Sequence, residues 1–323
     1  MSTRYRRFFR NYWLVNSRVL GSGVPLRELL TLKYPHRLPD APKPPALTVE
    51  FTDHCDLRCA YCNNLLFNKP RTYMGEDVFQ RLLQQIEAAK INRVRVSGGE
   101  PTLHPEMGRY MKELASRVKF LSIITNGQWK KPNIIKELVA SGVDLVEVSV
   151  DAGGAEYYEK SRQGASYQRL LDNLAALKEE RDRQGAKLII KSRLMVRPST
   201  KDLEDREVAF LRRYVDSVLP QYILKHPDSE YEEDVFYPRH VVQGEYTRCS
   251  MIFKDMQILM DGSVPLCQVL GSIIDDDRKL FVGNILHDDI LDIWRGEQMT
   301  RVRNAHRNRV IDDMAMCKGC NAM

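Results

Sequence analysis

The chain has 323 residues, 43% of them hydrophobic, and a formal net charge of +6. This length allows one barrel-sized domain with a smaller annex, and so modest a charge gives no reason to expect a nucleic-acid partner. No apolar run reaches the roughly 18 residues of a membrane span and no signal-peptide core follows the basic start, so we expect a cytoplasmic protein without membrane contact.

The first 45 residues are basic and aromatic and then rich in proline. We interpret residues 1–45 as an N-terminal arm and linker. Such an arm either packs on the main domain or offers a cationic surface to an anionic substrate or partner.

Residues 46–227 form the expected main domain. Short β-branched runs alternate there with helical patterns, which is typical of βα units on a parallel sheet. Six strands with helices between them indicate an α/β fold, either a partial barrel or an open doubly wound sheet. The expected strands are residues 46–52, 93–97, 120–125, 144–150, 187–196 and 220–225.

An acidic linker at residues 228–247 is expected to precede a small C-terminal domain at residues 248–323. Within that domain, apolar residues 258–260 and 264–266 flank Asp261 and Gly262, which predicts a β-hairpin. A run of basic residues near the end is expected to form a solvated helix face. Its members are Arg301, Arg303, His306, Arg307 and Arg309.

Three cysteines follow the first expected strand with the spacing C-x3-C-x2-C: Cys55, Cys59 and Cys62. Cysteines of a cytosolic protein normally stay reduced, so this grouping favours metal ligation over disulfides. Three thiolates do not close a four-coordinate structural zinc site. They can hold three irons of a [4Fe–4S] cube and leave the fourth iron open to a ligand.

This motif resembles that of the radical S-adenosylmethionine (radical SAM) superfamily, which implies a partial (β/α)6 TIM-like barrel. The resemblance implies that the open iron binds S-adenosylmethionine and that Tyr61, just before the third cysteine, lies near the adenine. After the second expected strand, Gly98, Gly99 and Glu100 resemble the motif that contacts the cofactor's amino group. Glycines allow close backbone approach, and a carboxylate suits an ammonium group.

Further cofactor contacts are implied at the ends of the next strands, where α/β barrels place their chemistry. Short polar side chains there can bond to ribose hydroxyls, and arginines suit the cofactor's carboxylate. Leu194 is the only candidate for an adenine contact on the fifth strand. The remaining expected contacts are Thr125, Asn126, Ser149, Asp151, Arg162 and Arg193.

A second cysteine set lies in the C-terminal domain and consists of Cys249, Cys267, Cys317 and Cys320. Four thiolates can hold zinc or an iron–sulfur cluster, and the spacing alone favours zinc. The segment from Gly262 to Cys267, however, resembles the G-x4-C motif of SPASM and twitch domains. Because only four cysteines are present, the resemblance implies one auxiliary [4Fe–4S] cluster beside the first.

The expected reaction follows from these two clusters. Full ligation uses all seven cysteines, so no thiol remains to return a hydrogen atom, and a two-electron oxidation is favoured over epimerisation. Sulfatase-maturing relatives carry an acidic residue after the cysteine of G-x4-C, but here Gln268 stands there and cannot act as a base. The catalytic base is therefore left unassigned.

The start of the chain is short for a fused leader-peptide domain, which favours a carbohydrate, aminocyclitol or nucleotide-sugar substrate. The resemblance also implies a flavodoxin or ferredoxin-type electron donor. Peptide modification, sugar epimerisation and a non-enzymatic zinc-binding module are the alternatives.

Overall fold

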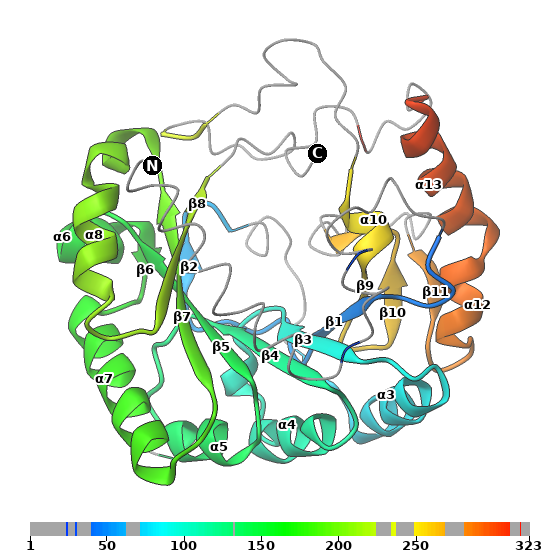
Figure 1. Cartoon of the computed structure of the whole chain (residues 1–323), viewed down its shortest axis with the longest axis horizontal. Helices are drawn as coiled ribbons and strands as arrows, with labels where there is room; N and C mark the ends of the chain where they lie inside the picture. Colours follow the sequence, from blue (N-terminus) through cyan, green and yellow to red (C-terminus); the bar gives the residue numbers. More distant parts are fainter. Residues whose placement is uncertain are drawn as a thin grey trace.

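The computed structural model describes residues 24, 30, 40–62, 72–131, 133–223, 234–236, 249–268, 281–310 and 317. In that part of the chain, a parallel seven-stranded sheet has the order β8-β7-β5-β4-β3-β1-β9. It curves into an open, partial barrel (Figure 1). The strands are β1 (Ala46–Glu50), β3 (Arg93–Ser97), β4 (Phe120–Thr125), β5 (Leu145–Asp151), β7 (Ile189–Val196), β8 (Ser217–Tyr222) and β9 (Asp255–Ile258).

The six expected strands are confirmed, although β8 begins three residues before the expected start. The expected start at Pro220 was too late. Since β8 is an edge strand, Pro220 can instead sit inside it.

Helices cover the convex side of the sheet (Figure 1). In the described residues, no helix is long and apolar enough to cross a membrane. The helices of the main domain are α3 (Glu76–Ala88), α4 (Met107–Ala115), α5 (Ile134–Ala140), α6 (Gly154–Ser161), α7 (Tyr167–Gln184) and α8 (Glu204–Leu211), with short 3-10 turns at Pro101–Leu103 and Pro198–Leu203.

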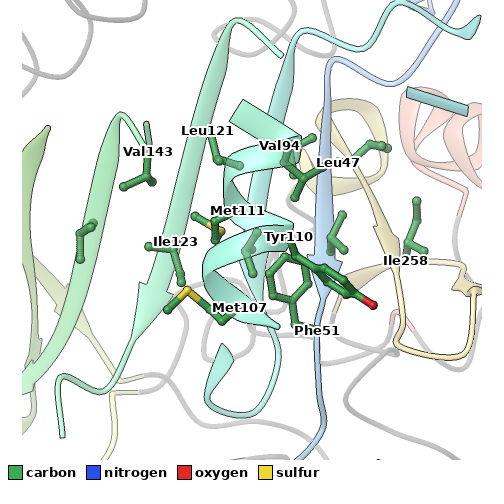
Figure 2. Close-up of a cluster of buried hydrophobic side chains, with 14 of the residues drawn as sticks. Leu47, Phe51, Val94, Met107, Tyr110, Met111, Leu121, Ile123, Val143 and Ile258 are labelled. Atoms are coloured by element: carbon green, nitrogen blue, oxygen red, sulfur yellow. The ribbon is translucent and has the colours of Figure 1, made fainter. Parts of the chain in front are cut away.

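The main core lies between these helices and the strands. Figure 2 shows Met107 and Met111 of α4 beside Ile123 of β4, and Tyr110 of the same helix beside Phe51, which follows β1. Tyr110 also stacks on Phe79 of α3, with ring centroids 3.6 Å apart. Because alternate residues of a strand face opposite sides, this packing turns the intervening residues towards the concave side.

A second apolar cluster joins the N-terminal arm to the start of the barrel. Val24 is buried against Phe120, Leu145 and Ile189, which lie at the amino ends of β4, β5 and β7. At Val24, the N-terminal arm therefore packs on the main domain.

The C-terminal part contributes to the main sheet, which the sequence did not predict. Strand β9 pairs in parallel with β1, with Ile258 opposite Val49. The predicted turn is present, since the Gly262 N–H donates to the Leu259 carbonyl at 3.0 Å. The antiparallel partner of β10 (Ser263–Pro265), however, is β11 (Phe281–Asn284) and not the preceding strand.

The expectation of a solvated basic face is wrong for two residues of α13 (Glu297–Asn308), a helix that follows α10 (Met251–Lys254) and α12 (Ile290–Arg295). Arg303 and His306 are buried. Arg303 donates to the Trp294 carbonyl at 2.6 Å and forms an ion pair with Asp40 at 3.3 Å. The ion pair with the distant Asp40 holds the linker before β1 against α13, which composition alone could not reveal.

Candidate active site

An open cavity of about 410 Å³ lies at the carboxyl ends of the strands. It brings together three thiols, the turn after β3 and the ends of β4 and β5. Three expected contacts, Asp151, Arg193 and Leu194, do not line it. The expected residues that do line it are Cys55, Cys59, Tyr61, Cys62, Gly98, Gly99, Glu100, Thr125, Asn126, Ser149 and Arg162.

The loop that carries the three thiols is tied to the segment after α6. Strand β2 (Arg58–Cys59) pairs antiparallel with β6 (Arg162–Gln163), which places Cys59 opposite Arg162. The Ala60 N–H donates to the Ser161 carbonyl at 2.9 Å. These backbone bonds orient the loop towards the cavity.

The donor set fits an iron–sulfur cluster with one open iron. Burial raises the pKa of Cys55 to about 12, and the neighbouring Cys59 and Cys62 thiols add to the rise. Burial also raises the pKa of Cys59 to about 11, although the Arg162 charge opposes it. Both thiols are therefore protonated without metal, whereas a thiol that coordinates a metal ion is deprotonated.

The described residues contain no group of three or more His, Cys, Asp or Glu side chains at the separations of a single-ion site. The assignment of the three thiols to a cluster therefore rests on their shared cavity and on the donor set.

The two glycines after β3 are required by close packing against the thiol-bearing loop. The Gly99 N–H donates to the Thr52 carbonyl at 2.8 Å, and the Glu100 N–H donates to the His54 carbonyl at 2.7 Å. A Cβ on Gly99 would lie 2.2 Å from the His54 carbonyl oxygen, and Gly98 has a φ of +119°. Any side chain at Gly99 would push this loop away.

We therefore expect Gly99→Ala to displace the loop that carries Cys55 and to destabilise the fold by about 1–3 kcal/mol or more, as overpacking does. Reconstituted protein should show reduced iron content and weaker S-adenosylmethionine binding. Gly75→Ala is a matched control, because its Cβ would meet only the movable carboxylate of Asp77. Iron loading and a melting temperature equal to wild type in Gly99→Ala would contradict this role.

The Glu100 carboxylate is directed mainly at protein donors. Its Oε1 accepts from the Thr102 N–H and hydroxyl and from the Thr125 hydroxyl, and its Oε2 accepts from the Asn126 N–H at 2.7 Å. Burial raises the pKa of Glu100, against the opposing effect of these hydrogen bonds. An ammonium contact stays a prediction; the contacts present show that Glu100 joins the turn after β3 to the end of β4.

Asp151 does not line the cavity, and its expected ribose contact stays a prediction. Its Oδ1 accepts from the Tyr61 hydroxyl at 2.7 Å and from Arg162 Nε at 2.8 Å. Its Oδ2 accepts from the Ser161 hydroxyl and faces Arg197 at 3.7 Å. The carboxylate is fully buried with these partners, which leaves Ser149 as the strand-end side chain that reaches the cavity.

The other expected contacts on β7 also lie elsewhere. Arg193 is 3.7 Å from the buried Glu147 carboxylate, on the concave side of the sheet. Leu194 is buried in the core that faces the helices and cannot contact adenine from there. Met195, the next residue, lines the cavity. Strand alternation could have suggested Met195, but only after the register of β7 was known.

The C-terminal thiols pack against the main core. Cys249 is buried, and its N–H donates to His306 Nδ1 at 3.3 Å, while Cys267 and Cys317 are partly buried. Cys320 lies outside the described residues. Gln268, the residue after Cys267, lines the cavity that also holds Cys55, Cys59 and Cys62. Cys267 therefore lies one residue along the chain from the wall of that cavity.

Two family models match the chain. The radical SAM superfamily model matches residues 49–208, and a model described as an iron–sulfur cluster-binding domain, SPASM, matches residues 249–321. The GTP 3′,8-cyclase of Lactiplantibacillus plantarum is 30% identical over 132 residues, which cover 39% of this chain and 40% of that protein. The match thus spans well under half of the relative's length.

Two solved structures share the fold. SuiB of Streptococcus suis bound to S-adenosylmethionine aligns over 92% of this chain and 74% of its own, with a TM-score of 0.59 and 17% identity. BtrN in complex with AdoMet and 2-DOIA aligns over 85% and 92%, with a TM-score of 0.54 and 19% identity.

Proposed function

Because the chain belongs to the radical SAM superfamily and carries a SPASM iron–sulfur domain, we propose that it oxidises a hydroxylated small molecule by two electrons. Membership implies S-adenosylmethionine and two [4Fe–4S] clusters as cofactors. The proposed substrate class is a carbohydrate, aminocyclitol or nucleotide sugar, and the proposed electron donor is a flavodoxin or ferredoxin.

The observation that carries the substrate class is the charged concave side of the sheet. Lys191 Nζ lies 2.6 Å from the buried Glu147 carboxylate, and Arg193 lies 3.7 Å from it. Burial disfavours ionised Glu147, but Lys191, Arg193 and Arg95 together outweigh it and lower the pKa of Glu147. TIM-barrel interiors are normally filled by branched apolar side chains. The side chains of Glu147 and its three cationic neighbours do not line the cavity, but its wall on the same side of the sheet carries Thr48, Glu50 and Gln257. Hydrogen-bonding groups in that wall support a substrate rich in hydroxyls over an apolar one.

Oxidation of an alcohol also requires a group that accepts the hydroxyl proton. Gln268 cannot, but its Nε2 donates to the Thr48 hydroxyl at 2.8 Å, and Thr48 donates to Asp255 at 3.1 Å. Burial raises the pKa of Asp255, against the nearby Arg95, which makes Asp255 a better proton acceptor than an exposed aspartate. We assign the proton to Asp255, reached from the cavity through Thr48.

Each part of the chain then has a role. Cys55, Cys59 and Cys62 would hold the first cluster, and the four C-terminal cysteines the auxiliary one. When bound, the first cluster and S-adenosylmethionine supply a 5′-deoxyadenosyl radical that removes hydrogen from a substrate carbon, and the auxiliary cluster supplies an electron acceptor. Gly98 and Ser149 would line the part of the cavity that binds S-adenosylmethionine. Gln268 and Thr48 would orient the substrate hydroxyl.

The test is anaerobic turnover of a panel of sugars, aminocyclitols and nucleotide sugars in heavy water, followed by mass spectrometry. One member should increase 5′-deoxyadenosine formation and yield a product that has lost two hydrogens. A product of unchanged mass apart from one solvent deuterium would instead establish epimerisation. Turnover confined to a short peptide encoded beside this gene would replace the substrate class by a peptide.

A further inference from the structure

We propose that Asp151 is a positioning residue that holds the Arg162 guanidinium against the sulfur of Cys59, and that this contact raises the reduction potential of the first cluster. The inference rests on the proposed assignment of Cys59 as a cluster ligand. It gives Asp151 and Arg162 a role in tuning the cluster, in addition to any cofactor contact that Arg162 makes.

The Arg162 guanidinium contacts Asp151 through two of its nitrogens and Cys59 through the third. Arg162 Nε and Nη2 each lie 2.8 Å from Asp151 Oδ1, which leaves Nη1 directed at Cys59 Sγ, 3.9 Å away. Ladder pairing of β2 with β6 places the backbones of Cys59 and Arg162 opposite each other. Both the backbone and the side chain therefore fix the arginine beside this one thiol.

The carboxylate is itself held from several directions. The Tyr61 hydroxyl donates to Asp151 Oδ1 and the Ser161 hydroxyl to Oδ2. Arg197 lies 3.7 Å from Oδ2 and over the Tyr61 ring, 4.8 Å from its centroid. The side chains of Asp151 and Arg162 are only 1% and 6% exposed. A buried carboxylate that accepts several hydrogen bonds cannot rotate freely, so it fixes the direction of the Arg162 guanidinium.

The expected consequence is electrostatic. Reduction adds a negative charge to an iron–sulfur cluster, and hydrogen bonds to its sulfurs and nearby charge set its potential. A guanidinium N–H beside the Cys59 sulfur favours the reduced form. The Asp151 carboxylate carries the opposite charge and weakens this effect, but it contacts Nε and Nη2, while Nη1 faces the sulfur. Burial of both groups keeps screening by solvent weak.

Anaerobic redox titration of the reconstituted full chain, followed by electron paramagnetic resonance, tests this inference. The first cluster is the one whose signal changes when S-adenosylmethionine is added. Arg162→Gln should lower its midpoint potential relative to wild type while the auxiliary signal stays unchanged. Lys160→Gln is the control, because it removes an exposed cation two positions away and should leave both potentials unchanged.

A double-mutant cycle tests the positioning role of Asp151. Asp151→Asn removes the ion pair that directs the guanidinium and leaves only the backbone pairing of Arg162. In that background, Arg162→Gln should shift the potential by less than half as much as in wild type. An undiminished shift would overturn the role of Asp151, and no shift from Arg162→Gln would overturn the contact with Cys59.

Arg162→Lys is a second variant, since it keeps a cation to pair with Asp151. One ammonium group cannot replace the guanidinium fork at both Asp151 and Cys59. The potential of the first cluster should therefore fall, but by less than in Arg162→Gln. Arg162→Lys also serves as the test if Arg162→Gln loads no cluster. In that case, a wild-type potential in Arg162→Lys would overturn the proposal. If wild type shows no signal that responds to S-adenosylmethionine, the failure lies with the proposed cluster and not with Arg162.

Discussion

Replacing Cys55, Cys59 and Cys62 together with alanine should remove one whole cluster and abolish cleavage of S-adenosylmethionine. Anaerobically reconstituted wild type should bind about eight irons per chain, as two four-iron cubes, and the triple variant about four. The three thiols share one cavity, while Cys249, Cys267 and Cys317 pack elsewhere against the core. Loss of one set should therefore leave the other intact.

Iron and zinc analysis of both proteins, with the melting temperature as a check on folding, measures this effect. Wild type that saturates at about four irons, or that carries stoichiometric zinc, would contradict the presence of an auxiliary iron–sulfur cluster. A triple variant that binds as much iron as wild type would remove these cysteines from the ligand set.

Replacing Cys267 with alanine should separate hydrogen abstraction from product formation. The first cavity keeps all three of its thiols, so 5′-deoxyadenosine should still form. Without an electron acceptor at the auxiliary site, the substrate radical cannot complete a two-electron oxidation, and oxidised product should fall below detection. The measurement is the ratio of product to 5′-deoxyadenosine, determined by chromatography and mass spectrometry.

Cys317→Ala should reproduce this uncoupling, because it removes a second proposed ligand of the same cluster from a different segment. Normal product yield in either variant would show that the auxiliary cluster does not accept the electron. Loss of 5′-deoxyadenosine as well would show instead that the damage extends to the first cavity, for example through Gln268, which lines it.

The strands of the main domain were predictable from sequence because their signals are local. Residues 93–97 and 120–125 carry β-branched and apolar runs bounded by turns, and the structure has strands there. The carboxyl ends of parallel strands meet at one edge of a sheet. The gathering of Gly98, Thr125 and Ser149 around the thiols follows from this rule and from the family resemblance.

Other features depend on contacts between distant segments, which no local pattern contains. Strand β9 joins the sheet by pairing with β1, and β1 lies about 200 residues earlier in the chain. Arg303 is buried because Asp40 and Trp294 supply its partners. Asp151 has the residue type and strand-end position of a ribose ligand, but Tyr61 and Arg162 occupy its carboxylate.

The most direct test of the account is the fate of S-adenosylmethionine with reduced, reconstituted enzyme under anaerobic conditions. Wild type should convert it to methionine and 5′-deoxyadenosine, and the variant without Cys55, Cys59 and Cys62 should form none. A wild-type protein that binds iron yet yields no 5′-deoxyadenosine, or an equal yield from the triple variant, would contradict the claim that these thiols build a radical-generating site.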